Sequence, residues 1–159
     1  MRGGFWPPAL LCAALAFALA FVPQRLRLSA IGILVMAALA ASRIEFPNAW
    51  HEAIFAVTWF SVVVAALLVH SPRYPAALVL IVAGNTGFWA GAVTAIDGTL
   101  RDLALAVPLV LLAWPGGWLV AQRGGIAIKV VASWLVAVAI LVAALPIVPT
   151  PGYALDHRE

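Results

Sequence analysis

Two polar side chains stand side by side inside one of the long apolar stretches of this sequence. Asn85 and Thr86 belong to the segment GNTGFWAG, residues 84 to 91. A carboxamide carries two donors and an acceptor, and in lipid these groups need a partner from another helix or from a ligand. We expect Asn85 to form a hydrogen bond with Thr58 or Ser61 on a neighbouring helix. The alternative is that Asn85 and Thr86 line a polar ligand site.

Small residues surround this pair at helical spacing. Gly84, Gly87 and Gly91 fall close to one stripe of a helix, and Ala95 continues it. In lipid, such a stripe lets a neighbouring helix approach to backbone contact. It therefore predicts close helix packing, and we expect the Asn85 hydrogen bond to cross this same close helix pair. Trp89 lies deep in the same segment and is a candidate either for helix packing or for lining a lipid, quinone or pigment site.

A second irregular stretch is AVPLVLLAWPGGWLV, residues 106 to 120. Pro108 and Pro115 each remove a backbone donor, so the helical hydrogen bonds must be interrupted and the freed carbonyls must find other partners. The pattern predicts a kink or an early helix end at Ala113. A broken helix can also build a substrate site from exposed backbone dipoles, which keeps Pro115 among the possible ligand-lining residues.

Ionisable side chains are absent from the middle of every apolar stretch. Lys129 comes closest, four residues into the last one, where its long stem can reach the membrane surface. Catalysis or ion coupling inside a membrane usually needs a buried charge, so the sequence indicates neither an enzyme nor a self-sufficient proton-coupled carrier.

The three histidines are the side chains that could bind haem iron or a metal ion. His51 and His70 are 19 residues apart, about 28 Å along a helix, so they cannot clamp one haem. His51, Glu52 and His157 are weak candidates for a surface metal site, but no metal-ligand spacing supports one, and interfacial histidines are the favoured interpretation. The sequence supports no particular cofactor.

Composition sets the fold class. Hydrophobic residues make up 65% of the 159 residues and charged residues 9%, whereas soluble domains are about 25% charged. We predict an all-α membrane protein, a bundle of six transmembrane helices with short loops, or of five if the second stretch does not span, forming one domain over residues 1–148 with a short extramembrane tail at 149–159. The second stretch is the weakest because it is short, with Arg27 and Arg43 expected to extend outward at its two ends. The apolar stretches are 5–22, 28–41, 49–69, 75–96, 103–121 and 126–148.

With six spans, the charges separate onto two faces. One face holds every acidic residue and four arginines, and the other holds five Lys and Arg residues and no acid. Because orientation follows Lys and Arg, we predict that both termini lie outside, on the periplasmic side of a bacterial inner membrane. The amino-terminal stretch, which also resembles a signal peptide, is interpreted as a retained first helix. The basic residues are spread singly, which does not favour nucleic-acid binding.

The leading functional hypothesis is a non-catalytic integral membrane subunit, or an assembly partner, of a larger membrane complex. Its expected partners are the lipid bilayer and other integral membrane subunits. The first alternative is a small transporter or channel with a site near Asn85, Thr86 and the broken fifth helix. The second alternative is a quinone- or haem-associated respiratory or photosynthetic membrane subunit.

Overall fold

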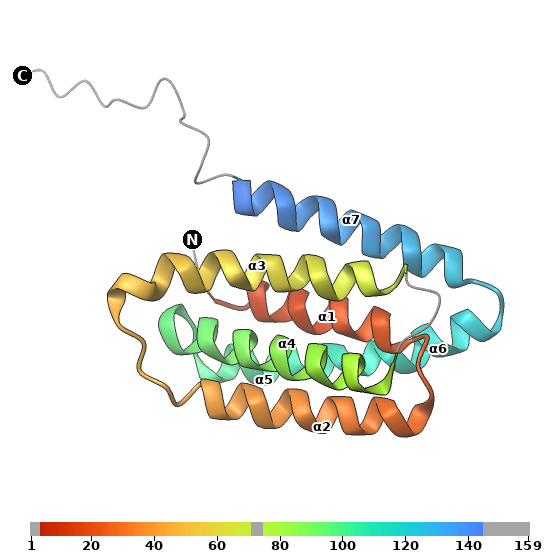
Figure 1. Ribbon diagram of the computed structural model, residues 1–159, viewed down its shortest axis with the longest axis horizontal. Coiled ribbons are helices and arrows are strands. Elements are labelled where there is room, and N and C mark those ends of the chain that lie inside the picture. The colour runs from red at the N-terminus through yellow and green to blue at the C-terminus, as the bar shows by residue number, and fades with distance from the viewer. Residues whose placement is uncertain (1–3, 71–74, 145–159) are drawn as a thin grey trace, which may run out of the picture.

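Helices make up nearly all of the chain that the structure describes. The structure is a computed structural model, and it describes residues 4–70 and 75–144 (Figure 1). These ranges contain no β-strand, which confirms the predicted all-α bundle. The predicted tail, residues 149–159, lies outside them. The elements in chain order are α1 (Trp6–Leu19), α2 (Gln24–Ala41), η1 (Asn48–Trp50), α3 (His51–Leu68), α4 (Ala76–Asp97), α5 (Leu100–Ala106), η2 (Val107–Leu112), α6 (Ala113–Ala121) and α7 (Gly125–Ala144).

Five of the helical stretches are long and apolar enough to cross a membrane, consistent with an integral membrane protein. The fifth segment counts as one of them because α5, η2 and α6 follow one another from Leu100 to Ala121. The second stretch is longer than expected, since α2 begins at Gln24, directly after Pro23, and has 18 residues. The prediction excluded Arg25 and Arg27 on hydropathy alone, although both residues are helical.

The apolar helix α1, with 14 residues, is shorter than the five stretches that are long enough to cross a membrane. Ten of those residues are buried, because α1 packs against α3, α4, α5, η2, α6 and α7 (Figure 1). Alanines such as Ala14 and Ala18 let these neighbours approach closely. A helix enclosed by protein on most sides does not have to match the thickness of the hydrocarbon core by its own length.

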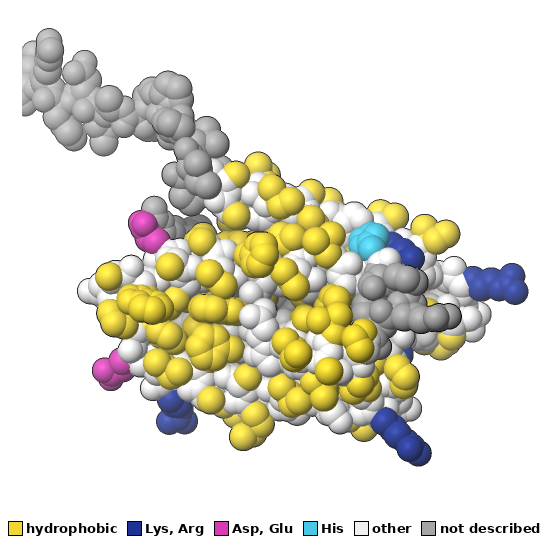
Figure 2. Space-filling view, in the orientation of Figure 1, with side chains coloured by type: hydrophobic (Ala, Val, Ile, Leu, Met, Phe, Trp, Pro, Cys, Tyr) yellow, Lys and Arg dark blue, Asp and Glu magenta, His cyan; other side chains and the backbone are white. Residues whose placement is uncertain are grey.

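The helices alternate in direction, so their ends gather at two ends of the bundle. In Figure 1, α1 and α3 start at the left, where α2 and α4 end, and α7 runs back from right to left. The acidic side chains of Figure 2 lie at the left, and most of the Lys and Arg side chains visible there lie at the right. We call these the acidic end (Arg43, Glu45, Glu52, Asp97, Arg101, Asp102) and the basic end (Arg25, Arg27, Arg123, Lys129).

Candidate functional site in the bundle interior

Asn85 connects α3 to α4 in the interior of the bundle. Its Nδ2 donates a hydrogen bond to Ser61 Oγ on α3 at 3.0 Å, and Ser61 is one of the two partners expected from the sequence. Its Oδ1 accepts a hydrogen bond at 2.9 Å from the indole Nε1 of Trp89, one turn further along α4. Both ends of the carboxamide are thus engaged within the protein. This arrangement fixes the register of two neighbouring helices.

The glycines of α4 face a different helix. A Cβ added to Gly87 would overlap the backbone of Leu34, and one added to Gly91 would overlap the backbone of Ala38, so α2 and α4 are in backbone contact at these two points. At Gly84, an added Cβ would meet only the Ile33 side chain, at an ordinary distance of 3.4 Å. The close approach therefore depends on two of the three glycines.

The sequence placed the glycine stripe and the Asn85 hydrogen bond on the same helix pair, and this expectation was wrong. The stripe packs on α2, whereas Asn85 reaches α3. Successive residues of an α-helix are about 100° apart, since 3.6 residues make a turn. Asn85, directly after Gly84, is therefore rotated far enough around α4 to meet a second neighbour.

The threonines of this region divide into two kinds. Thr58 and Thr94 donate hydrogen bonds to carbonyls of their own helices, Thr58 at 2.7 Å and Thr94 at 2.8 Å. Thr86 is fully buried, and its hydroxyl has no hydrogen-bond partner in the structure. The same holds for the indole Nε1 of Trp59 on α3. Within residues 4–70 and 75–144, these are the two buried side-chain polar atoms without a hydrogen-bond partner.

The irregular fifth segment continues as helix through both prolines. Pro108 lies in η2, a 3₁₀ stretch, and Pro115 lies in the first turn of α6, where backbone N–H groups have no intrahelical partner in any case. Of the predicted alternatives, an early helix end at Ala113 is wrong, because α6 begins at that residue and continues to Ala121. The tighter winding of η2 accommodates Pro108 without a break in the chain's course.

Arg27 holds the end of α1 against this fifth segment. Its Nε donates to the carbonyl of Val22 at 2.7 Å, its Nη2 to Ala20 at 2.9 Å and its Nη1 to Ala113 at 3.1 Å. A Cβ at Gly117 would overlap the guanidinium, so glycine there gives it room. The expected outward extension of Arg27 was wrong. Backbone carbonyls lack helical partners at helix ends and next to prolines. An arginine close to such a site in the sequence, as Arg27 is to the end of α1, is the signal that could have predicted this contact.

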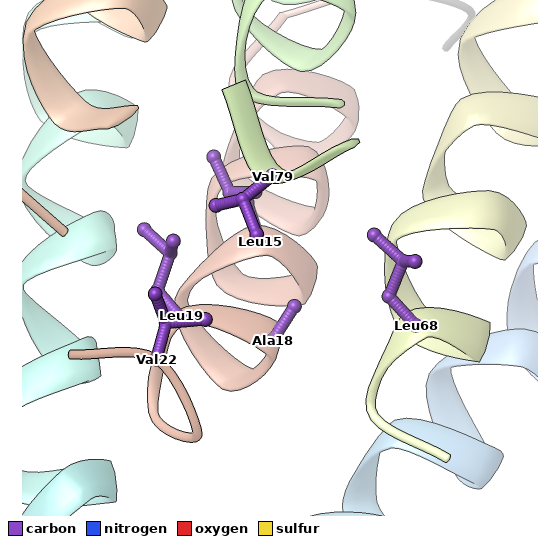
Figure 3. A pocket seen from close by; sticks show the side chains of 6 residues that line it. All are labelled: Leu15, Ala18, Leu19, Val22, Leu68 and Val79. Atoms are coloured by element: carbon purple, nitrogen blue, oxygen red, sulfur yellow. The ribbon is translucent and has the colours of Figure 1, made fainter. Parts of the chain in front are cut away.

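The cavities lie away from the Asn85 network. One small void of about 10 Å³ lies between α1, α3 and α4 and has six apolar residues around it (Figure 3). Another of about 10 Å³ lies at the acidic end beside His51 and Asp97. The larger one is an open groove of about 310 Å³ between α2 and the α5–η2 stretch. We call it the α2–α5 groove, and it is lined by Val35, Ala38, Leu39, Arg43, Leu100, Leu103, Ala104, Val107 and Pro108.

The histidines lie at opposite ends of α3. His70, just after that helix, is 3.2 Å from Ser133 on α7 through its Nε2. The Ser133 hydroxyl also donates to the carbonyl of Lys129 at 2.9 Å. Among the described residues, no three His, Cys, Asp or Glu side chains come together as a metal site. His157 of the predicted surface site with His51 and Glu52 lies outside the described ranges.

Comparisons with known proteins bring no relative. No protein-family model matches the chain, no curated protein is similar to it, and no solved structure matches its fold.

Proposed function

We propose that this chain is a non-catalytic integral membrane subunit, or an assembly partner, of a larger membrane complex. The observation that carries the proposal is the way in which polar side chains inside the bundle are paired. The Asn85 carboxamide is held between Ser61 and Trp89, and Arg27 is held by backbone carbonyls at three places. Polar groups that are satisfied within the fold set helix positions and are not free to bind a ligand.

The outer helices support the same proposal. In α2, in the stretch from α5 to α6 and in α7, only 22% of each apolar window is buried. On α7 this leaves large side chains such as Ile126, Trp134 and Leu141 more than half exposed. These faces meet lipid or other membrane-spanning helices, and a subunit needs apolar surface of this kind to associate within the bilayer.

A transporter or channel is the second candidate, and one observation favours it. The Thr86 hydroxyl and the Trp59 indole N–H are buried without a partner, and an unpaired polar atom of this kind costs roughly 1 to 3 kcal/mol. A permeating polar solute could supply the missing hydrogen bonds. The Asn85 network beside Thr86 is nonetheless closed, and neither the α2–α5 groove nor the two small voids are lined by Thr86.

Crosslinking in the native membrane tests the leading proposal. In a Cys12→Ala background, cysteines at Met36 on α2, Leu111 on η2 and Trp134 on α7 place a thiol on three exposed faces. A photoactivatable crosslinker attached to these thiols should give, from at least one face, an adduct with a different membrane protein that also copurifies in mild detergent. Leu135→Cys is the matched control on α7, because Leu135 is buried and should give no adduct.

Two results would contradict the proposal. One is a chain that purifies alone and gives no adduct from any of the three faces. The other is adducts that contain only a second copy of this chain. An absorption spectrum of the same preparation tests the haem-associated alternative, since bound haem would give a Soret band.

A further inference from the structure

The α2–α5 groove results from the way in which its two walls are held. Gly87 and Gly91 draw α2 onto α4, while α5 packs mainly on α1. A gap is left between α2 and α5. Its floor is made by Ala38, which is 1% exposed, and Leu103, which is 3% exposed, and its rims include the exposed side chains of Leu39 and Leu100. The groove is thus apolar at its base and open towards the surrounding lipid.

The groove has a direction across the membrane. The lining runs from Val35 on α2 to Arg43, two residues after that helix ends, and, in the opposite chain direction, from Pro108 on η2 to Leu100 on α5. Eight residue steps of α-helix correspond to about 12 Å. The groove therefore extends inward from the acidic end over less than half of a hydrocarbon core about 30 Å thick.

The one charged side chain that lines the groove is positive, although this end of the bundle as a whole is acidic. Arg43 is the one charged residue in the lining, and its exposed guanidinium has no ion-pair partner among the described residues. Arg101 precedes Ala104 by three residues, so it shares a helix face with a residue of the lining. Two acids stand near these arginines in the sequence. Glu45 follows Arg43 by two residues and is exposed. Asp102, directly after Arg101, accepts hydrogen bonds from the Thr99 backbone N–H and hydroxyl, both at 2.8 Å.

We propose that the α2–α5 groove binds a phospholipid, with one acyl chain lying along the apolar floor and the phosphate on Arg43. A flexible acyl chain fits a groove that starts at the interface and stops partway through the membrane. A transmembrane helix of another protein is about 10 Å wide and would need a groove along its whole length. An arginine offers paired donors that match a phosphate oxygen pair, which explains a lone guanidinium at this position. This proposal does not depend on whether the chain is a subunit.

Native mass spectrometry of the full-length protein in mild detergent tests the assignment. Two probes are added: dioleoylphosphatidylglycerol, which has a phosphate, and dioleoylglycerol, which has the same chains without one. We expect one tightly bound phosphatidylglycerol per protein and much weaker binding of dioleoylglycerol. Arg43→Gln should weaken phosphatidylglycerol binding about tenfold, since a charge-assisted contact is lost, and Arg43→Lys should lose less. Ala104→Phe should weaken both lipids, because it fills the groove.

Matched variants separate this site from general lipid adhesion. Arg123→Gln removes an exposed arginine at the basic end, and Ala137→Phe enlarges an exposed alanine on α7. Both should bind phosphatidylglycerol as the unmodified chain does. The proposal is overturned if Arg43→Gln and Ala104→Phe bind both lipids with unchanged affinity, or if the four variants weaken binding equally. It is also overturned if an Ala104→Cys thiol in native membranes crosslinks to a protein and not to lipid.

Discussion

Asn85 and Arg27 connect different parts of this bundle in different ways. Asn85 joins α3 to α4 through side chains alone, with Ser61 as acceptor and Trp89 as donor. Arg27 joins three points of the backbone, two after α1 and one at the start of α6. The Asn85 carboxamide uses one N–H donor and its oxygen acceptor here, whereas the Arg27 guanidinium supplies several donors to a cluster of free carbonyls.

Substitution of Asn85 separates a structural role from ligand binding. Asn85→Ala leaves the Ser61 hydroxyl and the Trp89 indole without their partner, and we expect a loss of about 1 kcal/mol in stability, because interhelical hydrogen bonds in membranes are weak. Activity of the host complex should remain nearly intact. Thermal unfolding in detergent and a functional assay of the complex, both on the same variant, make the comparison.

Thr94→Val is the matched control for this variant. The Thr94 hydroxyl bonds only to its own helix, at the carbonyl of Ala90, so its loss should change stability little. Full stability of Asn85→Ala together with lost function would refute the structural role and favour the transporter alternative.

Arg27 should be more sensitive than Asn85. Arg27→Gln removes the charge and most of the donors, and we expect a loss of about 2 to 3 kcal/mol because the carbonyls of Ala20, Val22 and Ala113 lose charge-assisted contacts. Arg27→Lys should recover only part of this loss, since an ammonium cannot reach three separate carbonyls. Thermal unfolding in detergent measures both. Arg25→Gln, an exposed neighbour, should behave like the unmodified chain, and equal effects at Arg25 and Arg27 would contradict the clamp.

The sequence predicted some of these contacts and missed others for physical reasons. The Asn85 to Ser61 hydrogen bond could be anticipated, because a carboxamide in lipid needs a partner and few polar residues are available. The role of Arg27 could not, because hydropathy treats an arginine near a span end as a residue that extends to the interface. Which carbonyls are free near it depends on how α1 ends and where α6 begins, and both are decided by tertiary packing.

At the scale of elements, the contact between α2 and α4 is the closest in the bundle. Gly87 and Gly91 stand where the carbonyl groups of Leu34 and Ala38 pass, so the distance between the helix axes is set by the absence of two side chains. Ala38 links this contact to the α2–α5 groove, since its backbone meets Gly91 and it also forms part of the floor. The packing of α2 on α4 and the shape of the groove are therefore coupled.

Three glycine-to-alanine substitutions on α4 test this contact, because each adds the same methyl group at a different position. Gly87→Ala and Gly91→Ala should each destabilise the bundle by about 1 to 3 kcal/mol, because a single methyl group must force α2 away. Gly84→Ala should be neutral or stabilising, since its Cβ has ordinary space and alanine favours the helix by about 1 kcal/mol over glycine. Thermal unfolding of the three variants ranks them. Equal behaviour at all three positions would mean that α2 does not pack on the stripe.

The bounds of the helices show where hydropathy is a good guide and where it is not. The predicted 75–96 segment and the observed α4 agree closely, because Pro75 and Gly98 mark its ends. The prediction for the first two segments was wrong in opposite directions. Residues 20–22 are apolar but form the turn before Pro23, which shortens α1, while Arg25 and Arg27 are charged but helical, which lengthens α2.

On the scale of the whole molecule, the fold places one short helix inside a ring of longer ones. At 1.5 Å per residue, the 14 residues of α1 correspond to about 21 Å, less than the hydrocarbon thickness. The missing length is no obstacle, because α3, α4 and the fifth segment surround α1 and supply the lipid-facing surface. The sequence indicated the number of helices well but not their depth, since Ala-rich segments look alike whether they face protein or lipid.

The separation of charge between the two ends leads to the topology prediction. Cysteines introduced at Asn48, between α2 and α3, and at Asp97, at the end of α4, lie at the acidic end, and one at Gln122, after α6, lies at the basic end. In a Cys12→Ala background, an impermeant thiol reagent added outside intact cells should label Asn48→Cys and Asp97→Cys but not Gln122→Cys. Opening the cells should then expose Gln122→Cys. This outcome follows from the larger number of Lys and Arg residues assigned to the basic end, which favours the inner side.

Two other labelling results would contradict parts of this prediction. Labelling of Gln122→Cys alone from outside would reverse the orientation and keep the fold. Labelling of Asn48→Cys and Asp97→Cys from opposite sides would contradict the antiparallel arrangement, since α3 and α4 together must return the chain to the side where it started.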